Sequence, residues 1–343
     1  YSPVPVTGPA WMSIYTGKTL EHHGVRDVWG RKRVLPGYGE SRSYEDQYCF
    51  WDALNATGRR VGLFGLPACH PPREVQSWHV GGCGSAPDAM FWPADIEEHI
   101  PDGSVPFARV DLIHRWGGSY PNFPDWPGRF GSLTDKKAIE LTQFDTWKAT
   151  AAALSLTKSC SVDVLFLCFT FVDRFLHERD WDALMREDGP TMSTVVYNMV
   201  NSTISAAEKD FKPDTTIIVS DHGGAHGMHT DMGVFAYKGA GLRPLPISER
   251  GPMYGGPLCL PNPTDADEEV RKPWLMRVDV GPQIAKPSTE DVAPTICKLM
   301  GAKLPEADGR PIREILIDDS EERQQAEHLY QLGYGPKPEG KPR

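Results

Sequence analysis

Two pairs of Asp and His residues suit a metal site by their types and spacing. Asp173 and His177 lie four residues apart, and they share one face if the chain turns into a helix after the preceding strand. Asp221 and His222 follow a β-branched run and precede two glycines, which let the backbone turn sharply beside a ligand. Either pair alone is typical of a surface pair or an ordinary turn. Together, carboxylates and imidazoles without cysteine favour Zn, Mn or Fe and predict a centre of two metal ions.

Other histidines and cations are weaker candidates. His226 and His229 follow the second pair, ahead of a strand-like stretch. A basic cluster, Arg26 with residues 31–33, could grip a phosphate, although a solvated loop is the more common meaning of such a cluster. The candidate metal-binding side chains are therefore concentrated in the second half of the chain.

Alternating strand-like and helix-like stretches must position these side chains. Apolar runs predict strands at residues 60–65, 162–171, 215–220 and 233–237, and amphipathic spacing predicts helices at 45–57, 146–158 and 193–211. Pro9 and Gly17 mark the first turn and the end of another helix, so Thr7 lies at a helix N-terminus. The alternation predicts an α/β fold with a mainly parallel central sheet sandwiched by helices, and ligands bind at the carboxyl ends of such strands.

Length and composition limit the possibilities further. A chain of 343 residues buries a large core, and we expect one domain over residues 1–330 with a cap around 66–135, a loop-rich segment at 239–288 and a tail at 331–343. The net charge of −10 argues against bulk nucleic-acid binding, and the longest apolar stretch, 162–172, is too short to span a membrane. The odd number of cysteines, seven, includes no CxxC pair, so we expect a reducing, cytoplasmic location rather than a secreted one.

A set of motifs runs in order through most of the chain. They are Thr7-Gly-Pro-Ala-Trp-Met-Ser-Ile-Tyr-Thr-Gly17, His23-Gly24-Val25, Arg60 to Pro67, Asp173 to His177, Ser220 to Gly223, Asp291 to Thr295 and Leu304 to Pro311. In this order they resemble the alkaline phosphatase superfamily, chiefly its type I phosphodiesterase/nucleotide pyrophosphatase and phosphohydrolase/phosphomutase branches. The resemblance implies an alkaline phosphatase-like fold with loop-rich cap insertions.

The resemblance also implies a set of site residues. A Thr or Ser at a helix N-terminus is the nucleophile in that family, which gives this role to Thr7. One metal ion would bind Asp173, His177 and a late histidine, and the other would bind Asp221, His222 and Thr7. We choose His229 as the late histidine, because the residues after it match the family, and His226 is the alternative. Two divalent ions are expected, above all Zn, with Mn or Fe as alternatives, whereas substrate-binding residues are not predicted.

The implied activity is the hydrolysis of a small-molecule phosphate ester. Thr7 attacks phosphorus in line, and water then hydrolyses the resulting phosphothreonine. A diester, a monoester and a phosphonate are all open as substrates. The alternatives are a metal-dependent phosphomutase and a catalytically silent binding protein that keeps the fold.

Three departures from the family's patterns refine this expectation. The first metal-binding Asp of the family lies on a strand upstream of the nucleophile, whereas this sequence begins six residues before Thr7. We expect a piece of a longer protein that lacks that strand, and the alternative is a second metal site that is weak because it is one ligand short. No residue after Gly24 matches the substrate-binding Asn of nucleotide pyrophosphatases, which argues against a nucleotide. No Cys-x-Pro-x-Arg surrounds Thr7, which argues against sulfate ester hydrolysis.

Overall fold

The computed structural model describes residues 1–27, 29–82, 90–100, 149–169, 172–173, 189–225, 228–231, 233–243, 287–317 and 331. The expected ligands His177 and His226 lie outside these residues, as do most of the expected cap and most of the loop-rich segment.

Four strands form the main sheet, in the order β5 (Phe91–Trp92), β4 (Trp78–Gly81), β3 (Val61–Leu66) and β6 (Val164–Leu167). Strand β3 pairs in parallel with β4 and β6, and β5 runs antiparallel to β4. The protein is thus a mixed α/β structure with a mostly parallel sheet. Strands β4 and β5 correct our expectation of loops or a cap there, because β4 is short and buried throughout, so it shows no alternation of polar and apolar residues.

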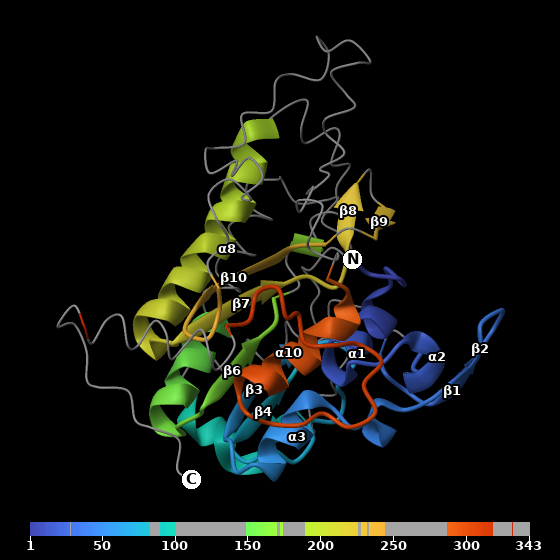
Figure 1. Ribbon diagram of the computed structural model, residues 1–343, viewed down its shortest axis with the longest axis horizontal. Coiled ribbons are helices and arrows are strands. Elements are labelled where there is room, and N and C mark those ends of the chain that lie inside the picture. Colours follow the sequence, from blue (N-terminus) through green and yellow to red (C-terminus); the bar gives the residue numbers. More distant parts are fainter. Residues whose placement is uncertain are drawn as a thin grey trace, which may run out of the picture.

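Helices cover both faces of this sheet (Figure 1). On one face, α1 (Thr7–Thr16), α3 (Phe50–Ala56) and α10 (Val292–Leu299) pack into a large hydrophobic cluster that includes Val61 and Leu63 of β3. This cluster contains most of the aromatic core and fixes α1 against the sheet. The position of Thr7 at the N-terminus of α1 confirms the expected helix start.

The opposite face packs against a helix formed by residues 149–159. Phe64 and Trp78 lie there in a second cluster with Ala152 and Leu156. The two faces of β3 alternate as the period of a strand requires, until Gly65 interrupts the register of pairing between β3 and β4. Gly65 has a φ of +74°, and a Cβ there would lie 2.7 Å from the carbonyl oxygen of Cys168. The glycine therefore lets β3 end close to the segment that leads to Asp173.

The predicted helix at 45–57 is divided in two. Its first part is the short 3-10 helix η1 (Tyr44–Asp46), and α3 begins only at Phe50. The break has a specific cause, because the Asp52 carboxylate accepts a hydrogen bond from the Cys49 backbone nitrogen at 2.8 Å and caps a new helix. Nη2 of Arg73 donates a hydrogen bond to Oδ1 of the same carboxylate at 3.1 Å.

Further helices and short strands complete the described part of the chain (Figure 1). They are α2 (Leu20–His23), β1 (Arg33–Leu35), β2 (Gly39–Ser41), η3 (Ala94–His99), α8 (Gly189–Phe211), β7 (Thr215–Val219), β8 (Gly223–Ala225), β9 (Met228–Thr230), β10 (Phe235–Gly239) and η7 (Thr289–Asp291). Strands β7 and β10 form an antiparallel pair, as do β8 with β9 and β1 with β2. Within the described part of the chain, no helix combines the length and the apolar character needed to cross a membrane.

Candidate metal centre

Asp173, His222 and His229 converge on one point beyond the sheet strands. One ligand atom from each lies within 4.8 Å of the others. The Nε2 atoms of His222 and His229 are 3.9 and 3.7 Å from Oδ1 of Asp173. Their rings stack with centroids 3.7 Å apart and planes 19° from parallel. One carboxylate oxygen and two imidazole nitrogens therefore meet in a space that a single divalent ion could occupy.

The backbone fixes which nitrogen of each imidazole faces this space. Nδ1 of His222 lies 2.9 Å from the carbonyl oxygen of Gly223, and Nδ1 of His229 lies 2.7 Å from that of Pro5. A carbonyl oxygen only accepts hydrogen bonds, so each Nδ1 carries the proton. In the neutral form of each ring, the lone pair is therefore on Nε2, the atom that faces Asp173. Metal-binding histidines are oriented by this kind of contact to a carbonyl group.

A second carboxylate, that of Asp221, lies beside the imidazole of His222. Oδ2 of Asp221 lies 3.3 Å from Nε2 of His222, and both residues are buried. Burial and the charge of nearby Asp173 raise the pKa of Asp221 to about 8. A divalent cation would oppose both causes, since it favours the charged form of a carboxylate beside it. The oxygen-and-nitrogen donor set fits Zn, Mn or Fe.

The segment before α1 is tied to the same cluster. The carbonyl oxygen that receives His229 Nδ1 belongs to Pro5, two residues before Thr7. The backbone nitrogen of Ser2 donates to the carbonyl oxygen of Asp231 at 2.7 Å. Residues 2–5 therefore run beside β9, and the N-terminus lies next to β8 and β9 in Figure 1. This arrangement brings the segment that leads into the helix of Thr7 to the clustered histidines.

Ser220 and Gly233 support the site, and neither was predicted from the sequence as a site residue. Ser220 pairs with Val234, its Oγ accepting from the Val234 backbone nitrogen at 2.6 Å and its own backbone nitrogen donating at 3.0 Å. A Cβ on Gly233 would lie 2.6 Å from Ser220 Oγ and 3.4 Å from the carbonyl carbon of His222. A glycine ahead of a strand is the only sequence signal for this close approach. The contact from Pro5 has no signal at all, because a backbone carbonyl makes it.

The structure brings together side chains that the resemblance assigns to two metal ions. Asp173 and His229 belong to one expected site, and Asp221 and His222 belong to the other. The structure brings Asp173, His222 and His229 within reach of one another and sets Asp221 against His222. Any two ions held by these four side chains would therefore be close neighbours.

A mixed α/β protein with an Asp and His cluster beyond its strands is a candidate metal-dependent enzyme. The sequence profile described as type I phosphodiesterase / nucleotide pyrophosphatase matches residues 2–237. The chain belongs to this family of hydrolases within the alkaline phosphatase superfamily. The matched range includes Thr7 and all four clustered side chains, and the family implies an alkaline phosphatase-like fold. No curated protein matches the chain.

Proposed function

We propose that this protein hydrolyses phosphodiesters or phosphomonoesters through Thr7 and a two-metal centre. The convergence of Asp173, His222 and His229, with both Nε2 lone pairs directed at the carboxylate, is the observation that carries the proposal. Family membership supports the phosphate ester as substrate.

The four described side chains would hold the metal ions from two sides. Asp173 and His229 contribute to one site, with His177 as a further proposed ligand, and Asp221 and His222 contribute to the other. When bound, the ions favour the alkoxide form of a coordinated hydroxyl and offset charge on the phosphoryl oxygens.

Thr7 is the proposed nucleophile. It begins α1, and the first-turn backbone N–H groups of a helix point toward this position and stabilise a phosphoryl group there. In the first step, an Oγ1–P bond forms while the bond from phosphorus to the leaving oxygen breaks. The Thr7 proton passes to solvent, and the alcohol leaves with a proton from solvent. In the second step, water attacks phosphorus, the Oγ1–P bond breaks, and Thr7 regains its proton.

Turnover by a Thr7→Ala variant tests this function. With Zn or Mn present, we expect the wild type to hydrolyse bis(4-nitrophenyl) phosphate or 4-nitrophenyl phosphate, and the variant to lose at least about a thousandfold in kcat. Thr7→Ser is the matched control, because it keeps a hydroxyl and should keep part of the rate. Mass spectrometry of the quenched wild type should find one phosphoryl group on the peptide that carries Thr7.

Each other outcome has a definite meaning. Full turnover by Thr7→Ala would remove Thr7 as the nucleophile. Metal binding by the wild type without turnover of either ester would contradict the hydrolase and favour a binding protein. Return of the phosphoryl group to a second position of the same substrate would identify a phosphomutase.

A further inference from the structure

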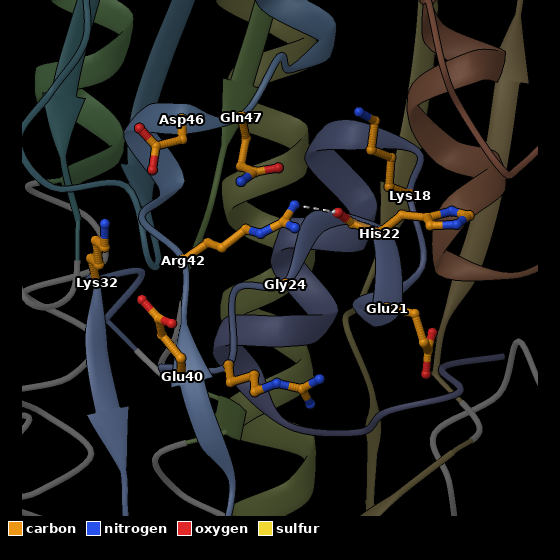
Figure 2. A pocket seen from close by; sticks show the side chains of 10 residues that line it. Lys18, Glu21, His22, Gly24, Lys32, Glu40, Arg42, Asp46 and Gln47 are labelled. Carbon is orange, nitrogen blue, oxygen red and sulfur yellow. Dashed lines mark hydrogen bonds between the residues drawn. The ribbon is translucent and has the colours of Figure 1, made fainter.

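A pocket lies beside the C-terminal end of α1 (Figure 2). It has a volume of about 620 Å³, and its walls come from α2, the β1–β2 hairpin and η1. Its lining includes the cations Lys18, Arg26, Lys32 and Arg42 and the carboxylates Glu21, Glu40 and Asp46. Because Lys18 follows the end of a ten-residue helix, about 15 Å of helix separates this end from the nucleophile. The pocket is therefore distinct from the metal centre.

The hairpin presents one face to this pocket. Val34 pairs with Glu40, and residues two positions away on either strand share their face. Lys32 and Arg42 occupy those positions, and both line the pocket with Glu40. Arg33 lies on the other face and pairs with the buried Asp27. The basic cluster noted in the sequence therefore has two roles. Arg33 forms an ion pair with a buried carboxylate, whereas Lys32 lines the pocket.

Arg42 is held in a defined position within the pocket. Its Nη1 donates to the carbonyl oxygen of His22 at 3.1 Å, as Figure 2 shows. Its Cδ lies 2.9 Å from where a Cβ on Gly24 would be, and Gly24 has a φ of +67°. Glycine therefore makes room for the stem of Arg42, and the guanidinium keeps further donors for a ligand.

Opposite charges line the pocket without neutralising one another. Lys18 pairs with Glu306 at 3.0 Å, outside the lining. Among the described residues, no ion pair within 4.0 Å joins the remaining cations, Arg26, Lys32 and Arg42, to Glu21, Glu40 or Asp46. Three cations and three carboxylates therefore face the same space. A ligand with a single charge meets both attraction and repulsion there, whereas a ligand that carries both signs gains from both.

We propose that this pocket binds a small zwitterion that carries one carboxylate and one ammonium group. The carboxylate binds Arg42, whose planar guanidinium matches two carboxylate oxygens. The ammonium binds Glu40, which lies two residues away on the same face of the hairpin. Such positions are about 7 Å apart along a strand, so the two charges of the ligand should be separated by several methylene groups. A carboxylate fits better than a doubly charged phosphate, because the unpaired lining charges balance.

Titration of the full chain with a series of ω-amino acids tests this proposal. The probes are β-alanine, 5-aminopentanoate and 8-aminooctanoate, with pentanoate and pentylamine as single-charge controls, and binding is followed by calorimetry or by NMR shifts of metal-free protein. An exposed ion pair contributes up to about 1 kcal/mol, which is about fivefold in affinity. We therefore expect 5-aminopentanoate to bind about fivefold more tightly than either control and more tightly than the shorter and longer amino acids.

Variants assign the binding to this pocket. Arg42→Gln and Glu40→Gln should each weaken the binding of 5-aminopentanoate about fivefold, whereas Arg31→Gln, a matched charge change outside the lining, should not. Asp173→Asn should retain the binding, which separates this site from the metal centre and from the proposed hydrolase. Equal affinity for pentanoate, unchanged affinity in Arg42→Gln, or the absence of saturable binding would each overturn the proposal.

Discussion

The histidines of the metal centre and those of the core differ in what the backbone offers them. At His222 and His229, Nδ1 faces a carbonyl oxygen, so the lone pair lies on Nε2. At His23 and His79, Nδ1 accepts from a backbone N–H, that of Val25 at 3.0 Å or Arg73 at 3.1 Å. The lone pair of each core ring, on Nδ1, therefore accepts a backbone hydrogen bond, and Nε2 carries the proton.

This contrast separates a candidate ligand from a structural histidine without reference to any bound ion. The core histidines are fully buried, and burial lowers the pKa of His23 to about 4 and that of His79 to about 3. They remain neutral and serve packing. The site histidines instead direct Nε2 toward the carboxylate of Asp173, which is the arrangement that a cation would complete.

Substituting one histidine from each group should give the largest difference in affinity for Zn. We expect His222→Ala to weaken the binding of Zn at least about a hundredfold, because it removes a nitrogen donor. His79→Gln should leave the affinity for Zn unchanged. Competition with a chromogenic chelator measures both. Equal affinity in the wild type and His222→Ala would remove His222 from the centre, and a loss in His79→Gln would end the distinction between the two groups.

The core histidines should instead control stability in acid. Between pH 6.5, the ordinary pKa, and its folded value of about 3, His79 binds a proton only in the unfolded chain. The free energy of unfolding is therefore intact above pH 6.5 and falls as the pH decreases, by about 1.4 kcal/mol per pH unit for this group.

Chemical denaturation of metal-free protein at several pH values measures this slope. His79→Gln cannot take up the proton, so its free energy of unfolding should depend less steeply on pH, by about the same 1.4 kcal/mol per unit between pH 4 and 6. Parallel curves for the two proteins would show that His79 is already charged in the folded state. His222→Ala serves as the matched substitution at the other site.

The sequence was sufficient for the features that short-range patterns encode. The apolar runs predicted β3 and β7, and the polar residues after strands pointed to Asp173 and Asp221, which the structure places beside His222, because strand period and turn chemistry act locally. Strand β4 was missed, since four buried residues carry no period. The contact between His229 and Pro5 joins residues 224 positions apart. Its acceptor is the backbone carbonyl oxygen of Pro5, so the residue type at position 5 gives no signal of it. The pocket likewise depends on the approach of Arg42 to Gly24, which only the folded chain brings together.

The smallest expected effect concerns the packing that supports His222 rather than its chemistry. Gly233→Ala places a methyl group 2.6 Å from Ser220 Oγ and 3.4 Å from the carbonyl carbon of His222, so the turn after β7 must move. We expect about a fivefold loss of affinity for Zn, equivalent to about 1 kcal/mol.

Because the closest obstacle is the Ser220 hydroxyl, Ser220→Ala should create the missing space. In that background, Gly233→Ala should cost clearly less affinity than it does alone, and a double-mutant cycle with chelator competition measures the difference. The single Ser220→Ala variant accounts for the lost hydrogen bond to Val234. If Gly233→Ala costs the same in both backgrounds, the hydroxyl is not the obstacle, and the backbone of residues 220–222 must be. If it costs nothing, the geometry of the candidate metal-binding histidines does not depend on the segment before β10, in contrast to the core histidines, whose rings the surrounding packing fixes.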